Sequence, residues 1–232
     1  MHHAAGVVPA TFWSAPAGSA DPPPLTLLQH GGAVHARHPA VDELANAVAV
    51  RTGGAVLLVD GPIHGRRRSA PLGFAEMLAA FEAFWRDDGG IDAMVSDWRL
   101  VLDVVLDRGW ADPGRVAWLG VSMGTAYGIP VCAADPRIRA AAFGMWGLSW
   151  GRGDRLVSDA ARLTVPALFQ IKEADEIFPV AGQRALFDAL GSPDKRLSTF
   201  AGGHSLSGPG QLDQLLDFTA AATGADRSEA TR

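Results

Sequence analysis

A serine stands between two glycines in the segment Gly-Val-Ser-Met-Gly, residues 120–124, directly after an apolar run. A serine hydroxyl attacks a carbonyl carbon effectively only when a base takes its proton and a third group orients that base. A sharp turn from a strand into a helix would expose the hydroxyl of Ser122, and such a turn needs small residues two positions to either side. The spacing therefore predicts a nucleophile at Ser122. A glycine-rich turn with a purely structural role is the alternative.

A base and an acid for this serine should come from later loops. His204 lies in Phe-Ala-Gly-Gly-His-Ser-Leu, after a predicted strand at 195–201, and no other histidine follows residue 64. The loop after the preceding predicted strand supplies Glu173, Asp175 and Glu176. We choose Asp175 because it lies deepest in that loop, and we expect the other two acids to be solvated loop charges.

The negative oxygen of a tetrahedral intermediate needs preorganised hydrogen-bond donors. The main-chain N–H of Met123 is one candidate. The loop after residues 25–29 offers a second in His30-Gly31-Gly32, where backbone without side chains can approach a substrate. We expect the oxyanion donors to be Met123 and Gly32, with Gly31 as the fallback and His30 organising the loop.

Strand-like and helix-like segments alternate along the chain and are joined by short turns rich in glycine and proline. Predicted strands lie at 25–29, 55–60, 115–121, 138–146, 165–172 and 195–201, and predicted helices at 39–52, 70–86, 92–108, 123–134, 180–190 and 210–222. This alternation predicts an α/β fold with a mostly parallel sheet and helices on both faces. We expect a single domain over 1–223 and a polar C-terminal tail over 224–232.

Composition limits the classes of function. Of the 232 residues, 48% are hydrophobic, the net charge is −5, and residues 66–68 form the one basic cluster, so nucleic acid is not expected as a partner. The single cysteine, Cys132, excludes an internal disulfide and a cysteine-based zinc site. His30, His35 and His38 have no acidic residue at ligand spacing, so no metal site is expected.

The same composition bears on where the protein works. The 19 uncharged residues between Arg115 and Asp135 contain glycines and a proline, and they indicate a strand, a turn and a buried helix rather than a membrane span. No targeting segment is evident, and we expect a cytoplasmic protein. Arginine outnumbers lysine 18 to 2, which is typical of a GC-rich bacterial genome.

With these motifs in order, the sequence resembles the α/β-hydrolase superfamily, in its dienelactone-hydrolase-like and small esterase branch. The matching segments are HGG at 30–32, DGPIHGRR at 60–67, DPGRVAWLGVSMG at 112–124, EADEIFP at 173–179 and GGHS at 202–205. The family order of nucleophile, acid and histidine matches Ser122, Asp175 and His204. The chain departs from the family pattern at Thr125, where a second glycine often follows the nucleophile turn, and in a first strand that is short or absent.

The resemblance implies a three-layer α/β-hydrolase fold. The stretch 146–163 is too short for a large cap domain, so we expect a relatively open site. The implied function is hydrolysis of a small carboxylic ester or lactone through an acyl-enzyme, with no cofactor. A peptidase or thioesterase using the same triad, and a non-catalytic binding protein of this fold, are the alternatives. A small-molecule substrate is the expected partner, and a homodimer stays open.

Substrate contacts are the least defined part of the sequence interpretation. Arg66, Arg67 and Arg68 follow a loop expected near the mouth of the site, where an arginine could hold a carboxylate. A solvated or salt-bridged loop is the alternative for these arginines. We predict Arg66, Trp146 and Phe178 as substrate-binding residues, with packing in the core or at the rim as the alternative for the tryptophan.

Overall fold

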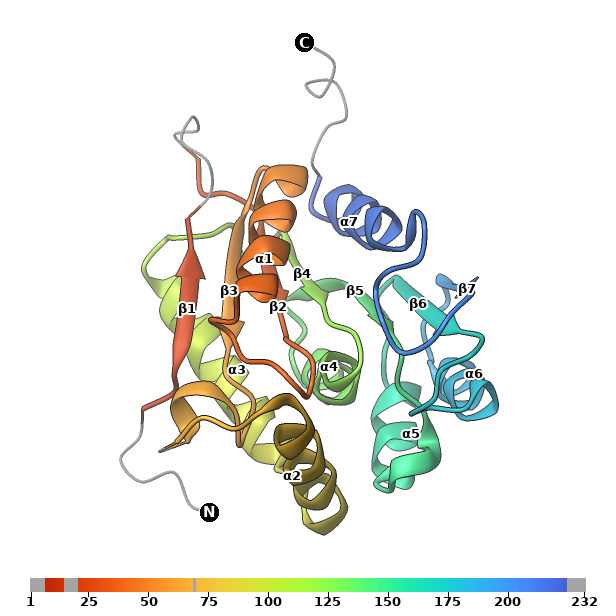
Figure 1. Cartoon of the computed structure of the whole chain (residues 1–232). Helices are drawn as coiled ribbons and strands as arrows, with labels where there is room; N and C mark the ends of the chain where they lie inside the picture. Colours follow the sequence, from red (N-terminus) through yellow and green to blue (C-terminus); the bar gives the residue numbers. More distant parts are fainter. Residues whose placement is uncertain (1–6, 15–20, 69, 225–232) are drawn as a thin grey trace.

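The computed structural model describes residues 7–14, 21–68 and 70–224. Within them the chain forms a seven-stranded sheet with strand order β1-β3-β2-β4-β5-β6-β7 (Figure 1). The strands are β1 (Ala10–Trp13), β2 (Leu25–Leu28), β3 (Ala55–Val59), β4 (Val116–Leu119), β5 (Ile138–Gly144), β6 (Ala167–Lys172) and β7 (Lys195–Phe200). The α-helices are α1 (Pro39–Thr52), α2 (Phe74–Asp87), α3 (Ile91–Asp107), α4 (Met123–Ala134), α5 (Gly153–Ala161), α6 (Val180–Ala189) and α7 (Gln211–Ala222). Two short 3-10 helices, η1 (Gly65–Arg67) and η2 (Leu148–Trp150), lie in the connections.

The sheet is parallel except at one edge. Strand β1 pairs antiparallel with β3, and all other neighbouring strands pair in parallel. Parallel pairing brings the carboxyl ends of β2, β4, β6 and β7 to the same edge of the sheet, where ligands bind in open α/β sheets. The predicted fold class, a mostly parallel α/β sheet, is confirmed.

Successive side chains along the strands pack into two separate hydrophobic clusters, one on each face of the sheet. Leu27 packs into the cluster beneath α2 to α6, whereas its neighbour Leu28 packs into the cluster beneath α1 and α7. Figure 1 shows α1 and α7 together on one face of the sheet. Because both faces are covered, the inner strands β3 and β4 consist of buried apolar residues without a polar face, and the molecule has three layers.

Helix α4 lies deepest among the helices. Its first ten residues, Met123 to Cys132, are all buried, so no exposed polar stripe is present over these positions. The helix continues through Pro130 to Ala134, so this proline does not end it. Between β5 and β6 the chain forms only η2 and α5, which is far short of a cap domain.

Along the described ranges, no helix is long and apolar enough to cross a membrane. The predicted polar tail at 224–232 lies outside the described residues except for Gly224.

Candidate active site

Ser122 sits on a sharp turn between β4 and α4. Its backbone has φ 57° and ψ −124°, a conformation that a residue with a side chain rarely adopts. A Cβ atom at Gly120 would lie 2.9 Å from the main chain of Gly124, and a Cβ at Gly124 would lie 2.7 Å from the carbonyl oxygen of Gln29. The two glycines are therefore required by close backbone contacts, and they allow the turn to present the Ser122 hydroxyl at the edge of the sheet.

Thr125 ties this turn to the neighbouring strand. Its hydroxyl accepts the N–H of Gly144 at 2.8 Å and lies 2.7 Å from the Gly144 carbonyl oxygen and 3.1 Å from that of Gly120. The Ser122 N–H also donates to the Gly144 carbonyl at 2.8 Å. The threonine that departs from the family pattern thus fastens the nucleophile turn to the end of β5. The sequence shows only a small polar residue after a glycine, so it carries no signal for this contact.

His204, in the loop between β7 and α7, contacts both Ser122 and Asp175. Its Nε2 lies 2.9 Å from the Ser122 Oγ, and its Nδ1 lies 2.9 Å from the Asp175 Oδ2. A carboxylate only accepts hydrogen bonds, so the proton of the neutral imidazole lies on Nδ1 and Nε2 is free to accept from the serine. The structure therefore brings together the three residues that the sequence analysis selected.

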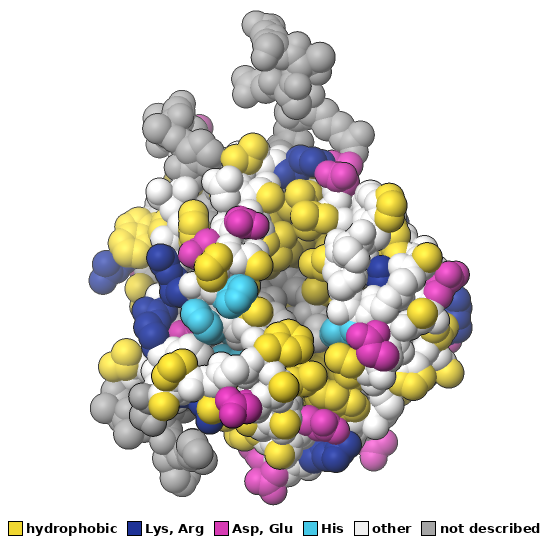
Figure 2. Space-filling model, in the orientation of Figure 1, with side chains coloured by type: hydrophobic (Ala, Val, Ile, Leu, Met, Phe, Trp, Pro, Cys, Tyr) yellow, Lys and Arg dark blue, Asp and Glu magenta, His cyan; other side chains and the backbone are white. Residues whose placement is uncertain are grey.

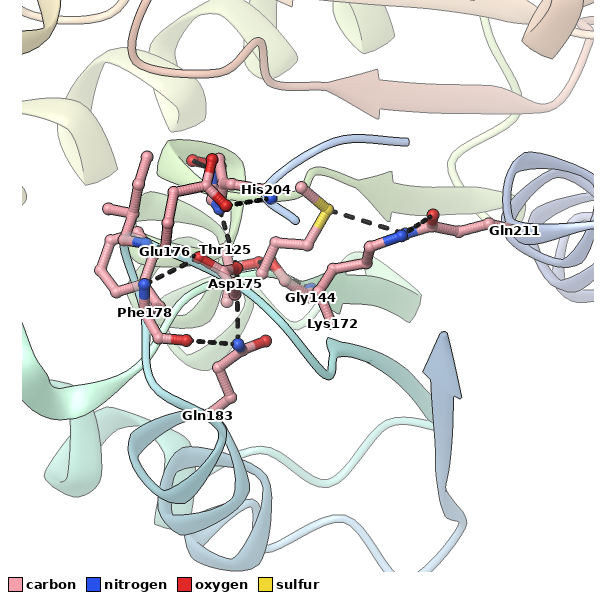
Figure 3. Close-up of polar contacts among 12 residues, drawn as sticks. Thr125, Gly144, Lys172, Asp175, Glu176, Phe178, Gln183, His204 and Gln211 are labelled. Atoms are coloured by element: carbon pink, nitrogen blue, oxygen red, sulfur yellow. Dashed lines mark hydrogen bonds and ion pairs between the residues drawn. The ribbon is translucent and has the colours of Figure 1, made fainter. Parts of the chain in front are cut away.

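Asp175 is held in place by its own loop (Figure 3). Its Oδ1 accepts the N–H groups of Ile177 at 2.9 Å and Phe178 at 2.8 Å, and the Gln183 amide lies 3.4 Å from Oδ2. Burial opposes ionisation of Asp175, but the hydrogen bonds from His204 and from the Phe178 and Ile177 N–H groups outweigh it and hold its pKa below the ordinary value. Asp175 therefore faces His204 as a carboxylate at neutral pH.

The other two acids of this loop have different surroundings. Glu173 is exposed. Glu176 is also exposed, but its Oε2 accepts the main-chain N–H of His204 at 2.9 Å, and this hydrogen bond lowers the pKa of Glu176. A Cβ atom at Gly203 would lie 2.6 Å from the same oxygen, so a side chain there would displace the Glu176 carboxylate. Glu176 thus holds the main chain of His204 while Asp175 holds its ring, a role that the sequence analysis did not assign.

Two buried histidines fix the loop after β2. The His30 Nε2 accepts the Gly61 N–H at 2.9 Å, so its proton lies on Nδ1, which donates to the Gly31 carbonyl at 2.8 Å. The C=O and N–H of a trans peptide point in opposite directions, so this bond turns the Gly32 N–H away from His30. The His64 Nε2 donates to the Gly32 carbonyl at 2.7 Å. The clamp formed by His30 and His64 therefore orients both peptides of the glycine pair.

Both clamping histidines are neutral at pH 7. Burial is the main cause, and it lowers the pKa of His30 well below the ordinary value and that of His64 to about 4.

The other predicted oxyanion donor is the main-chain N–H of Met123, which is the first residue of α4. Main-chain N–H groups at the start of a helix have no acceptor within the helix. Such a helix start also favours negative charge.

A cavity of about 460 Å³ opens at Ser122 and His204. Gly31 and Gly32 line it on one side, and its remaining walls come from α1, α2, α7 and the strand ends. Figure 2 shows a hollow at the centre of this face, bordered by hydrophobic side chains and by histidines on two sides.

The three residues predicted to bind substrate do not line this cavity. Trp146 and Phe178 are each 1% exposed and stack at a ring-centroid distance of 4.3 Å in the core beneath α2. Arg66 reaches the other way, donating to the Ala10 carbonyl at 2.9 Å and to the Asp60 carboxylate at 3.3 Å. The reason is tertiary: β1 pairs with β3 beside the arginine loop and supplies the carbonyl that Arg66 binds.

The two neighbouring arginines are also occupied. Arg67 is buried and forms an ion pair with Asp97 at 2.7 Å. Arg68 donates to the Ile63 carbonyl at 3.3 Å.

Solved structures resemble this chain closely, although no family model and no curated protein matches it. A cold-adapted esterase from an Arctic intertidal metagenomic library is 31% identical over 93% of this chain and 88% of its own, with a TM-score of 0.81. An acetyl xylan esterase from Paenibacillus sp. R4 shares the fold at 18% identity and a TM-score of 0.66, covering 92% of this chain and 80% of its own. Esterase PE8 shares it at 17% identity and a TM-score of 0.69, covering 93% and 99%.

The sheet order, the nucleophile turn and these likenesses define an α/β hydrolase. The chain belongs to the α/β-hydrolase superfamily, in its esterase branch. The resemblance to the α/β-hydrolase superfamily and its esterase branch that the sequence indicated is therefore confirmed.

Proposed function

We propose that this protein is a serine esterase that cleaves small carboxylic esters, including cyclic esters, through an acyl-enzyme. The observation that carries the proposal is the pair of 2.9 Å contacts joining Ser122, His204 and Asp175. The likeness to an esterase at 31% identity supports ester hydrolysis in particular.

In the first half of the reaction, the Ser122 Oγ attacks the ester carbonyl carbon while the His204 Nε2 takes the hydroxyl proton. Asp175 stabilises the resulting imidazolium. The N–H groups of Met123 and Gly32 donate to the oxyanion. The tetrahedral intermediate then breaks its bond to the alcohol oxygen, which receives the proton from Nε2. The alcohol leaves, or, when the ester is cyclic, remains as a hydroxyl group on the acyl chain.

In the second half, water replaces the alcohol. The His204 Nε2 takes a proton from water as the water oxygen attacks the acyl carbon. The bond to the Ser122 Oγ breaks, the proton passes to that oxygen, and the carboxylic acid leaves. No other group is consumed.

A fluorophosphonate probe and a chromogenic ester test this proposal together. The wild-type protein should be labelled at Ser122 and should hydrolyse p-nitrophenyl acetate, and Ser122→Ala should lose both, with kcat falling on the order of 10³-fold or more. Ser96→Ala is the matched control, because the Ser96 hydroxyl only bonds the Asp92 carbonyl on α3.

Two results would contradict the proposal: a folded wild-type protein that the probe does not label, or turnover that survives in Ser122→Ala. Thioester and aminoacyl-amide substrates measured alongside would distinguish an esterase from a thioesterase or a peptidase with the same triad.

A further inference from the structure

The cavity at Ser122 has apolar walls. Val41 and Leu44 of α1 face Leu206 and Leu215 at the α7 side, while Phe74 and Leu78 of α2 close a third side. Among the described residues that line it, none is an aspartate, glutamate, lysine or arginine. The site therefore offers a substrate apolar contact and the hydrogen-bonding groups of the nucleophile region, without a counter-ion.

The basic residues line a different cavity. Arg37, Arg66, Arg68 and His35 border a neighbouring cavity of about 410 Å³, which Ser122 and His204 do not reach. Only the chain at 33–34 borders both cavities. The three arginines therefore lie on the other side of this segment and form no part of the wall of the Ser122 cavity.

Charge and chain length have opposite effects in such a cavity. A carboxylate or ammonium group entering it would lose its hydration and gain no opposite charge. Each methylene group buried there is favourable, corresponding to a gain of roughly fourfold in binding. The walls thus select an uncharged aliphatic group.

The acyl part of the ester fits this place better than the alcohol part. The acyl group stays bound to Ser122 until water attacks, whereas the alcohol must leave after the first step. Leu28 and Leu119, at the carboxyl ends of β2 and β4, line the cavity and are 1% and 2% exposed, so its wall at the sheet is buried and apolar. A buried, apolar wall suits the group that stays.

We propose that the protein hydrolyses esters of uncharged, medium-chain aliphatic acids, with the acyl chain seated between α1 and α7 beside Leu44. The inference rests on the proposed esterase function. An ester of an uncharged acid differs from the anionic substrate that the basic cluster at 66–68 would otherwise indicate.

Substrates matched in chain length test the charge selection. p-Nitrophenyl hexanoate and the mono-p-nitrophenyl ester of adipic acid both carry six-carbon acyl chains, and only the second ends in a carboxylate. We expect kcat/KM to be at least about 100-fold higher for the hexanoate. Equal rates, or faster cleavage of the adipate, would overturn the proposal.

A bulkier side chain between α1 and α7 tests the placement of the acyl chain. Leu44→Trp should reduce the ratio of kcat/KM for p-nitrophenyl octanoate to kcat/KM for p-nitrophenyl acetate at least tenfold. Leu100→Trp is the matched control, because Leu100 is 50% exposed on α3 and does not line the cavity. An equal loss on acetate and octanoate, or no loss on either, would contradict a chain between α1 and α7.

Binding to Ser122→Ala separates this inference from the proposed function. Calorimetry should show that this variant binds p-nitrophenyl hexanoate and not the adipate monoester. Hexanoate selectivity without wild-type turnover would refute the esterase function alone. Turnover of esters without that selectivity would refute the acyl-chain proposal alone.

Discussion

The acidic residues 173, 175 and 176 show how neighbours of one type acquire different tasks. Asp175 points to the His204 ring and is buried, whereas Glu176 lies at the surface and accepts the His204 main-chain N–H. Both contacts restrict the histidine, one through its side chain and the other through its backbone. In the proposed mechanism His204 reaches Ser122 from a loop, and both restraints favour it because catalytic geometry tolerates little displacement.

Replacing Glu176 separates its hydrogen bond from its charge. Glu176→Gln keeps an acceptor oxygen for the His204 N–H and should leave kcat within about twofold, whereas Glu176→Ala removes the acceptor and should lower kcat roughly five- to tenfold. KM should change little in either variant, since Glu176 does not line the cavity. Steady-state kinetics on p-nitrophenyl butyrate would measure both effects.

The exposed neighbour Glu173 provides the control. Glu173→Ala should behave as the wild type. If Glu176→Gln loses as much activity as Glu176→Ala, the charge rather than the hydrogen bond is the important property.

At the level of elements, the nucleophile turn depends on how closely α4 approaches β2. Gly124 lies so near the Gln29 carbonyl that a methyl group would overlap it at 2.7 Å. That carbonyl belongs to the segment leading into His30 and Gly31, so the two halves of the predicted oxyanion site meet at this contact. Helix α4 and the loop after β2 are therefore coupled through one glycine.

Gly124→Ala should push α4 away from this loop. We expect it to destabilise the fold by about 1–3 kcal/mol, since backbone at the contact cannot yield like a flexible side chain. Activity should fall more than tenfold, because the Met123 N–H and the Gly32 N–H would separate. Thermal unfolding and kcat would both be measured.

Gly153→Ala is the control for this glycine substitution. The nearest atoms to a Cβ there lie at 3.8 Å, an ordinary contact distance at the start of α5. A stable and fully active Gly124→Ala protein would show that the turn tolerates a displacement of α4.

At the level of the whole molecule, the two buried histidines make the free energy of unfolding depend on pH. The pKa of His64 is about 4 in the folded protein and near 6.5 when the chain is unfolded. Between these two pH values the unfolded state binds more protons than the folded state. The His64 contribution to the free energy of unfolding is therefore fully present above pH 6.5 and is lost as the pH approaches 4. Asp175 acts at lower pH, because its lowered pKa removes stability only as acid protonates its carboxylate.

Denaturant unfolding at pH 7.0 and pH 4.5 should show this loss. Complete protonation of His64 should lower the free energy of unfolding by about 3 kcal/mol. His64→Gln should abolish this part of the pH dependence. Glutamine keeps an N–H donor for the Gly32 carbonyl and does not titrate in this range. The same pH dependence in wild type and His64→Gln would contradict a role for His64, and His30 would then be the group to replace.

Local patterns in the sequence were sufficient for the fold class. The predicted strands and helices correspond to the observed elements from β2 to α7, because apolar runs and glycine-rich turns are local properties of the chain. Helix α5, within 153–161, was not predicted, since it occupies a short stretch read only as too small for a cap. The antiparallel edge strand β1 corresponds to the first strand that was expected to be short or absent, because its pairing with β3 is a long-range contact.

The sequence by itself determined the parts of the site that follow from short spacing: a serine flanked by glycines after a strand, a glycine pair after another, and acids and a histidine after two later strands. Only the tertiary structure decided which groups meet. It set Asp175 against the His204 ring and Glu176 against its main chain, and it directed Arg66 to β1. It also made the cavity at Ser122 apolar. These outcomes depend on contacts between residues far apart in the chain, such as α1 beside α7, and no local pattern records which side chains such packing brings together.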